Sequence, residues 1–264
     1  MKDVNLSKRM EAVVNMVSPQ SFTIADVGCD HAYVSIALIS RHIAKKVVAM
    51  DVRTGPLSIA KRNVEEAGYT GDIDIRLGDG LEQLRPGKAD TIIIAGMGGL
   101  LIKGILERGE HILHYKEKQP VLILQPQSDL KEVRMFLYQQ GYCIVKETML
   151  VEDGKCYTVM KAEPVAYTKA ACLEMDSHDL ECCDAEYDEE EWVYGRYNLM
   201  NRSEVLFDYL QKERDVLKRI LNRIESTVEK ASDKEEMIPE STRKRMESIK
   251  QEILINHKAL QYFQ

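Results

Sequence analysis

Polar residues that could take part in binding or catalysis are concentrated in one short stretch near the start of the chain. An apolar run that ends at Val27 predicts a buried strand, and the residues from Ala32 to Leu38 predict a helix. The junction between them carries Asp26, Gly28, Cys29, Asp30, His31 and Tyr33. Because ligands bind at the carboxyl ends of the strands in an open α/β sheet, we expect a ligand site at this junction.

Three further predicted strands end in residues of a similar kind. Lys46–Asp51 ends in a carboxylate that Val52 follows, and Ile73–Leu77 leads into Gly78-Asp79-Gly80. Thr91–Ile94 leads into Ala95-Gly96-Met97-Gly98-Gly99. Since parallel strands bring their carboxyl ends to one edge of a sheet, we expect these turns to lie beside the first one.

Taken together, the four turns predict an adenosine site. Gly28 lets the backbone approach a ligand without a side chain in the way. Asp51 would accept hydrogen bonds from ribose hydroxyls, as in dinucleotide-binding folds. Asp79 would accept the exocyclic amine of adenine, with Val52 and Leu81 on the two faces of the ring. The alternative is that these are four ordinary turns, since each motif alone occurs in many α/β proteins.

The residues after Gly28 favour S-adenosylmethionine over other adenosine cofactors. A dinucleotide needs helix N–H groups open to its pyrophosphate, and Asp30 would repel that group. Asp26 and Asp30 instead suit the ammonium of an amino acid, and the sequence has no Walker lysine loop. The expected cofactor contacts are Asp26, Gly28, Cys29, Asp30, His31, Asp51, Val52, Asp79, Gly80, Ala95, Gly96 and Met97.

Alternating strands and helices must position these turns. Helices are predicted over Leu6–Val17, from Gly55-Pro56 to Gly68 and over 129–140, and a fifth strand over Val121–Leu124. Tyr142–Val151 and Cys156–Ala162 flank Glu152-Asp153-Gly154-Lys155, a sequence typical of a hairpin turn. The pattern indicates an α/β fold with a mostly parallel sheet and an antiparallel terminal hairpin.

The composition changes after residue 164. Residues 174–191 are acid-rich without Lys or Arg, which indicates a solvated linker or loop. Beyond them, apolar residues recur at helical spacing from Leu199 to Val228 and from Ile238 to Phe263, which predicts an antiparallel helical hairpin close to a coiled coil. We therefore expect a cofactor-binding domain over 1–165, an acidic linker over 166–192 and the hairpin over 193–264.

Charge and cysteine content narrow the class of protein. Residues 1–160 carry 20 basic and 20 acidic side chains, so the net charge of -7 belongs to residues 161–264. Nucleic-acid binding would therefore need local basic patches. The six cysteines show no disulfide spacing, and Cys172, His178, Cys182 and Cys183 fit no zinc pattern, so no metal is expected. No apolar run reaches membrane-span length and the N-terminus has no signal core, so a cytoplasmic protein is expected.

At this point the sequence resembles the bacterial tRNA (adenine(22)-N1)-methyltransferases. The matching strings are Asp26-Val-Gly-Cys-Asp-His-Ala-Tyr33, Asp51-Val-x-x-Gly-Pro-Leu57, Gly78-Asp-Gly-Leu81, Ile94-Ala-Gly-Met-Gly-Gly99, Leu124-Gln-Pro126, Leu6-Ser-Lys-Arg9 and Tyr194-Gly195. The resemblance covers nearly the whole chain, and the segment 172–191 departs from it. It implies a Rossmann-like class I methyltransferase sheet with a C-terminal coiled-coil hairpin.

The resemblance also implies a reaction, namely methyl transfer from S-adenosylmethionine to adenine N1. The neutral N1 atom has a free lone pair, so catalysis would consist mainly of placing it in line with the methyl group. Carbonyl groups of Ala95–Met97 would ease the positive charge that develops on the base. Tyr33 would stack on a flipped-out adenine, and Asp30 and His31 would contact the cofactor or orient the base. The alternative roles are packing for Tyr33, a helix-start hydrogen bond for His31 and close helix packing for Gly98-Gly99.

The expected partner is tRNA, bound by a protein that we expect to be a monomer. Candidate contacts are Lys8, Arg9, Tyr33, Arg214, Lys218, Arg219 and Arg223, of which the last four follow helical spacing. Two alternatives remain open: a methyltransferase of the same fold for another nucleic acid or a small molecule, and a non-catalytic module that docks a partner through its hairpin.

Overall fold

The structure is a computed structural model that describes residues 4–19, 21–166, 186–233 and 237–264. The chain forms two compact units, Met1–Glu186 and Tyr187–Gln264. Most of the predicted linker lies outside the described residues, so the domain limits 1–165, 166–192 and 193–264 stay a prediction. Within the described ranges, no helix combines the length and the apolar character that crossing a membrane requires.

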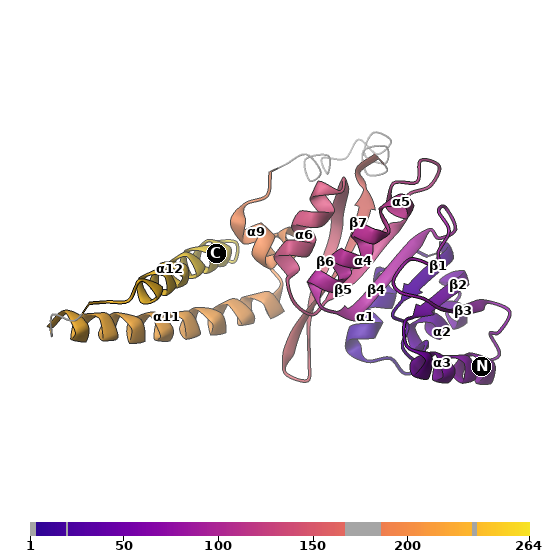
Figure 1. The fold of residues 1–264 in the computed structure, drawn as a ribbon, viewed down its shortest axis with the longest axis horizontal. Helices are drawn as coiled ribbons and strands as arrows, with labels where there is room; N and C mark the ends of the chain where they lie inside the picture. The colour runs from indigo at the N-terminus through magenta and orange to yellow at the C-terminus, as the bar shows by residue number, and fades with distance from the viewer. Residues whose placement is uncertain (1–3, 20, 167–185, 234–236) are drawn as a thin grey trace. The chain divides into compact units, whose positions relative to one another are not determined.

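The first unit is built on a seven-stranded sheet with the order β3-β2-β1-β4-β5-β7-β6 (Figure 1). Neighbouring strands from β3 to β5 are parallel, whereas β7 is antiparallel to both β5 and β6. The predicted α/β class, with a mostly parallel sheet and an antiparallel terminal hairpin, is therefore confirmed. The strands are β1 Ser21–Val27, β2 Ala44–Asp51, β3 Ile73–Leu77, β4 Thr91–Met97, β5 Val121–Pro126, β6 Tyr142–Glu152 and β7 Lys155–Pro164.

Helices cover both faces of this sheet. One face packs against α1 Lys8–Met16, α2 Tyr33–Ser40 and α3 Thr54–Ala67. The other carries α4 Gly99–Arg108, α5 Glu110–Leu113 and α6 Leu130–Gln139, and Figure 1 shows α4 and α6 side by side. Because both faces are covered, Ile92, Ile93 and Ile94 are all fully buried. This explains why β4 is a continuous apolar run.

The hairpin between β6 and β7 turns at the two residues that the sequence indicated. Asp153 has φ 49° and Gly154 has φ 73°, and such paired left-handed residues match the twist of the adjoining strands. The turn places Glu152 at the end of β6, beside the start of α1, where its carboxylate accepts a hydrogen bond from the Arg9 backbone N–H at 3.1 Å. The hairpin thus contacts the helix that carries Arg9.

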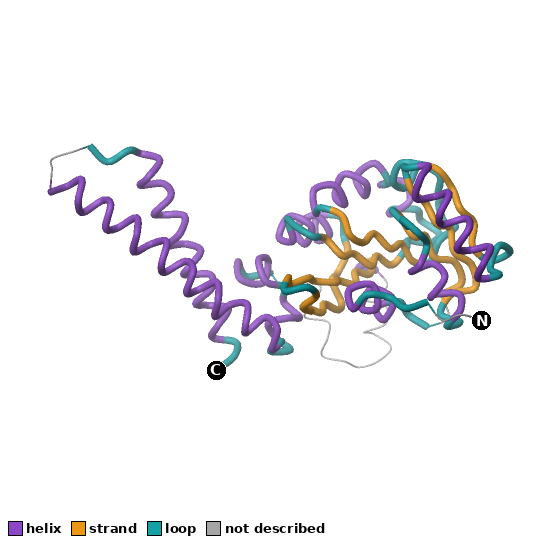
Figure 2. The backbone as a smooth tube through the Cα atoms, turned by 90° about the horizontal axis from the view of Figure 1, so that it is seen from below, coloured by secondary structure: helices purple, strands orange, loops and turns teal. Residues whose placement is uncertain are grey.

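The second unit consists of α9 Glu189–Tyr194, α10 Arg196–Met200, α11 Glu204–Asp233 and α12 Glu240–Gln261. α11 and α12 lie side by side (Figure 2), as the predicted helical hairpin requires. Asn256 of α12 is fully buried and donates to the Leu210 carbonyl at 3.0 Å and to the Glu213 carboxylate at 2.9 Å. One prediction was wrong: Leu199 lies on α10, because the chain leaves helical geometry at Asn201–Ser203.

The end of the acidic stretch is also not a solvated loop. Asp188 and Glu191 form a capping box at the start of α9. Glu190 and Glu191 are 6% and 7% exposed, and both oxygens of Glu191 accept hydrogen bonds from the Arg196 guanidinium, at 2.9 and 2.8 Å. The fork geometry of this pair explains how a carboxylate can be buried here.

Candidate functional site

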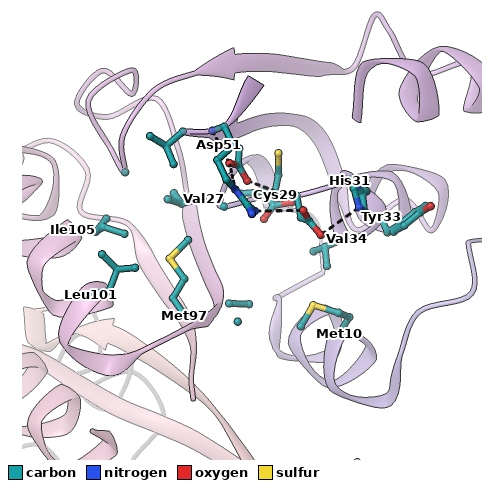
Figure 3. A pocket seen from close by; sticks show the side chains of 18 of the residues that line it. Met10, Val27, Cys29, His31, Tyr33, Val34, Asp51, Met97, Leu101 and Ile105 are labelled. Carbon is teal, nitrogen blue, oxygen red and sulfur yellow. Dashed lines mark hydrogen bonds and ion pairs between the residues drawn. The ribbon is translucent and has the colours of Figure 1, made fainter. Parts of the chain in front are cut away.

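A cavity of about 530 Å³ opens at the carboxyl ends of β1, β2 and β4 in the first unit. Figure 3 shows Met97, Leu101 and Ile105 on one side of it and His31, Tyr33 and Met10 on the other. This volume is within the range of ordinary small-molecule and cofactor sites. The first turn, the second and third strand ends and the end of β4 all contribute to its lining.

The structure brings every predicted cofactor contact together at this cavity. Its lining includes Asp26, Gly28, Cys29, Asp30, His31, Asp51, Val52, Asp79, Gly80, Ala95, Gly96 and Met97. Of the predicted tRNA contacts, Arg9 and Tyr33 line it, whereas Lys8 is an exposed residue of α1 outside the lining. Arg214, Lys218, Arg219 and Arg223 belong to α11 of the second unit.

The first turn is held by an unusual backbone conformation. The N–H groups of Gly28 and Cys29 both donate to the Met50 carbonyl, at 2.7 and 3.0 Å. Gly28 has φ 74°, and a Cβ there would lie 2.1 Å from the Met97 methyl carbon, so only glycine fits without displacing Met97. Asp30 and Ala32 are also left-handed, with φ 49° and 61°. For Ala32 this costs about 1 kcal/mol, which the surrounding packing must offset.

Asp51 ties this turn to the second strand. One carboxylate oxygen accepts the Asp30 N–H at 3.2 Å, and the other accepts the Arg53 N–H at 2.9 Å. The side chain is almost fully buried, at 4% exposed. Asp51 therefore orders the loop around the cavity, in addition to the ribose contact expected of it.

Burial changes the charge state of two groups in the cavity. Desolvation is the main cause that raises the pKa of Asp26 from 3.8 to about 6; the charge of Asp51 acts in the same direction, and a 2.6 Å hydrogen bond from Ser35 opposes the shift. Desolvation, together with the negative charges of Asp26, Asp51 and Asp30, raises the pKa of the Cys29 thiol far above its ordinary value. Cys29 therefore stays a neutral thiol and is not an activated nucleophile.

The third strand end differs from the expectation in one respect. Asp79 lines the cavity and accepts hydrogen bonds from Arg108 Nη2 at 3.2 and 3.3 Å. Leu81 is buried and would touch a Cβ added at Gly109, so it does not form one face of an adenine slot. Ile105 of α4 lines the cavity instead, 2.9 Å from the position of a Cβ on Gly80.

At the end of β4, the strand runs three residues further than the sequence indicated. Its pairing with β5 shifts register between Ala95 and Met97, and Gly96 has φ 78°. The Gly96 N–H donates to Gln125 Oε1 at 3.0 Å. Gly99 lies outside the lining, and a Cβ there would be 2.4 Å from the Ser128 carbonyl oxygen. Gly96 thus keeps the cavity wall free of side chains, and Gly99 serves close helix packing.

His31 and Tyr33 lie at the open side of the cavity. Their ring centroids are 6.0 Å apart in an edge-to-face arrangement. His31 Nε2 is 3.6 Å from the Asp30 carboxylate, and its backbone carbonyl accepts a hydrogen bond from Asn63 at 3.0 Å. Tyr33 is 46% exposed, so its ring is accessible to a planar ligand.

Several lining residues were missed by the sequence analysis. Met10, Arg53, Leu101, Ile105 and Gln127 contact the cavity from α1, the loop after β2, α4 and the loop after β5. Arg53 was detectable, because it follows Asp51 closely. The others reach the cavity through helix packing and left no local sequence pattern.

Metal-binding residues are not grouped in the described part of the chain. No cluster of three or more His, Cys, Asp or Glu side chains with metal-site geometry occurs there. Cys172, His178, Cys182 and Cys183 lie outside the described residues.

The chain matches known proteins both in sequence and in structure. A family model described as "Methyltransferase domain" matches residues 6–160. The tRNA (adenine(22)-N(1))-methyltransferase of Bacillus subtilis is 44% identical over 163 residues, which cover 62% of this chain and 67% of that protein.

Two solved structures extend the match to both units. A crystal structure of the Bacillus subtilis m1A22 tRNA methyltransferase is 29% identical, covers 97% of this chain and 99% of its own, and superposes with a TM-score of 0.78. A Streptococcus pneumoniae candidate tRNA (m1A22) methyltransferase in complex with S-adenosyl-L-methionine is 28% identical, with coverages of 97% and 100% and a TM-score of 0.76. With its Rossmann-like sheet, this chain belongs to the methyltransferases, in the family of the tRNA (adenine(22)-N1)-methyltransferases.

Proposed function

We propose that this chain transfers a methyl group from S-adenosylmethionine to N1 of adenine 22 in tRNA. The observation that carries the proposal is the cavity, in which four strand ends place carboxylates, glycines and apolar side chains in the order that this cofactor requires. The family of the chain supports the same reaction, because relatives matched over nearly the whole chain are described as m1A22 tRNA methyltransferases.

The residues present fit the cofactor in charge and shape. Asp26, Asp30 and Asp51 line the part of the cavity around the first turn, where a cationic ammonium and a sulfonium are favoured and a pyrophosphate is not. Gly28 and Gly96 leave the backbone free of side chains on either side of Met97. Asp79 and Val52 lie at the third and second strand ends and, with Ile105 of α4, form the adenine end of the site.

The bound cofactor supplies an electrophilic methyl group, whose bond to sulfur breaks as the bond to nitrogen forms. The protein's own contribution is placement, because neutral adenine N1 already carries the attacking lone pair and needs no base. Positive charge develops on the adenine as the sulfonium is neutralised. We assign the stabilisation of that charge to backbone carbonyls of Ala95–Met97, residues that line the cavity at a wall where Gly96 carries no side chain.

The target adenine must leave its stack to reach this wall. Tyr33 is half exposed at the open side of the cavity and offers a face on which a flipped base can stack. Asp30 and His31 belong to the first turn, next to Tyr33, and either contact the cofactor or orient the base. Cys29 takes no part in proton transfer, because its thiol stays neutral.

Contacts to the rest of the tRNA come from basic residues outside the cavity. Lys8 is exposed at the start of α1. In the second unit, Lys218, Arg219 and Arg223 are exposed on α11, whereas Arg214 is partly buried and donates to the Gln211 side chain. We assign the phosphate contacts to the exposed residues Lys8, Lys218, Arg219 and Arg223, in a monomeric protein of the bacterial cytoplasm.

The test is methyl transfer to defined tRNA transcripts by the full-length chain. Incubation with cofactor labelled in its methyl group should label an unmodified tRNA that carries adenine 22. Reverse transcription should then stop at this position, since N1 methylation blocks base pairing. The matched substrate, with guanine at position 22, should remain unlabelled.

Variants separate the enzyme from a non-catalytic module. Asp51→Ala should weaken cofactor binding measured by calorimetry, whereas Arg62→Gln on the exposed face of α3 should not. Absence of transfer to every tRNA tested, or equal labelling of both transcripts, would refute the assignment to adenine 22.

A further inference from the structure

The Arg9 side chain is mostly buried and contacts the side chains of Gln125, Glu152 and Tyr157. Its side chain is 21% exposed and lines the cavity. Nη1 donates to Gln125 Oε1 at 3.1 Å, and Nε lies 3.6 Å from a carboxylate oxygen of Glu152. The guanidinium carbon is 5.0 Å from the centroid of the Tyr157 ring. Residues of β5, β6 and β7 thus fix the orientation of one arginine from α1.

Gln125 connects this arginine to the cavity wall. Its side chain is fully buried, and its Oε1 atom accepts from both Arg9 Nη1 and the Gly96 N–H, the latter at 3.0 Å. Its Nε2 atom donates to the Pro126 carbonyl at 3.2 Å. The amide therefore has both ends satisfied and cannot rotate without losing a hydrogen bond. Arg9 Nη1 is held 3.6 Å from the position of a Cβ on Gly96.

Arg9 still has unused hydrogen-bond donors. Among the described residues, Nη2 has no hydrogen-bond acceptor, and Nε is buried without one. Glu152 and Gln125 contact the guanidinium but do not line the cavity. Because Nε is buried and faces Glu152, the donor available to a ligand beside Gly96 and Met97 is Nη2.

The charges around the cavity define the ligand group that these donors suit. Asp26, Asp30, Asp51 and Asp79 make most of the lining acidic. The other arginine in the described lining, Arg53, is 65% exposed and faces Asp51 and Asp30 at 3.4 and 3.5 Å. An anionic ligand group can therefore be placed next to Arg9, away from the carboxylates at the second and third strand ends.

We propose that Arg9 binds the carboxylate of the cofactor's amino-acid moiety, with Gln125 as the residue that positions it. The inference rests on the proposed function, because it takes S-adenosylmethionine as the ligand. An α-amino acid is a zwitterion, and the cavity offers carboxylates for its ammonium near the first turn and a guanidinium for its carboxylate near the end of β4. A planar guanidinium is well suited to carboxylate recognition.

The experiment compares three ligands that differ in this moiety. Calorimetry measures the binding of S-adenosylmethionine, decarboxylated S-adenosylmethionine and 5′-methylthioadenosine to the full-length protein. Arg9→Gln should weaken binding of the first about 10- to 100-fold, the value of one or two hydrogen bonds to a charged group, and leave the other two within about twofold. Arg62→Gln removes a positive charge on α3 and should change none of the three.

Two further variants keep the test independent of any damage to the fold. Arg9→Lys retains the charge but lacks the planar guanidinium that faces Gln125 and the ligand with separate nitrogens, so it should lose part of the preference for the carboxylate. Gln125→Leu should lower the same preference although it never touches the ligand. Unchanged binding of 5′-methylthioadenosine shows in each case that the adenosine end of the cavity is intact.

The proposal is overturned if Arg9→Gln weakens all three ligands equally or weakens none. It is also overturned if the only effect of that variant is a higher KM for tRNA, which would make Arg9 a nucleic-acid contact. If the wild-type protein binds S-adenosylmethionine with the Arg9-dependent preference but methylates no tRNA, the proposed function fails and the carboxylate site stands.

Discussion

The Asp26 carboxyl group is enclosed by protein, with the Ser35 hydroxyl as its hydrogen-bond donor at 2.6 Å. Its pKa of about 6, raised from 3.8 mainly by desolvation, means that the folded protein binds this proton more tightly than the unfolded chain does. Stability of the ligand-free protein should therefore fall as the pH rises from about 4 through 6, and then level off. A cationic ligand beside Asp26 would favour its ionised form and so offset this loss of stability.

Binding of S-adenosylmethionine should release a proton from Asp26 near pH 6. The cofactor's ammonium favours the ionised carboxylate, so the affinity should rise between about pH 5 and pH 7 and then stay constant. Calorimetry in buffers of different ionisation enthalpy measures the proton release directly. Asp26→Asn should abolish both the release and the rise, and an unchanged pH profile in that variant would exclude Asp26 as the source.

At the scale of single residues, the sequence predicted which side chains meet at the cavity but not all of the hydrogen bonds that they make. Asp26, Asp51 and Asp79 were placed correctly because strand ends converge at one edge of a parallel sheet. The tie between Asp51 and the Asp30 N–H depends on a left-handed backbone at Asp30, which no local pattern indicated. The position of Arg9 depends on residues more than a hundred positions away in the sequence.

At the scale of elements, α4 offers two glycines in contrasting surroundings. A Cβ at Gly99 would lie 2.4 Å from the Ser128 carbonyl oxygen and 2.9 Å from that of Asp129, so α4 would have to move away from the start of α6. A Cβ at Gly104 would meet only an Arg108 nitrogen, at 3.6 Å. Alanine substitutions at these two positions therefore distinguish the effect of close packing from the effect of helix propensity.

Gly99→Ala should destabilise the protein by about 1–3 kcal/mol, the usual cost of overpacking. Gly104→Ala should stabilise it by about 0.5–1 kcal/mol, since alanine favours a helix interior over glycine. Urea unfolding of both variants measures the difference. Equal effects at the two positions would show that close approach of the α4 and α6 ends does not constrain Gly99.

Strand and helix positions were largely predictable, whereas their irregularities were not. Continuous apolar runs identified the parallel strands because both faces of the sheet are covered. The register shift in β4 follows from a hydrogen bond to the buried amide of Gln125, a partner on another strand. The burial of Glu190 and Glu191 depends on the packing of short helices, so an acid-rich composition alone suggested solvent exposure.

At the scale of the whole molecule, the excess of negative charge lies in the C-terminal part of the sequence. The net charge of -7 arises entirely from residues 161–264, which include the predicted tRNA-binding helix. On α11, about 100° per residue places Lys218 about 100° from Arg219 and puts Arg219 and Arg223 within about 40° of each other. The four predicted residues therefore do not form a single row, and Lys218, Arg219 and Arg223 are the exposed ones.

Replacing Lys218, Arg219 and Arg223 together by glutamine should raise the KM for tRNA and leave the Kd for S-adenosylmethionine unchanged. Each lost phosphate contact lowers the slope of log affinity against log salt by about 0.7–0.9, so up to three contacts should reduce it by about 2–3. The control carries Lys61, Arg62 and Lys116 replaced by glutamine, three exposed residues of the first unit. Filter binding of tRNA over a salt series measures both proteins. If the control loses as much of the slope as the α11 variant, binding responds to total charge alone, and α11 carries no specific tRNA contact.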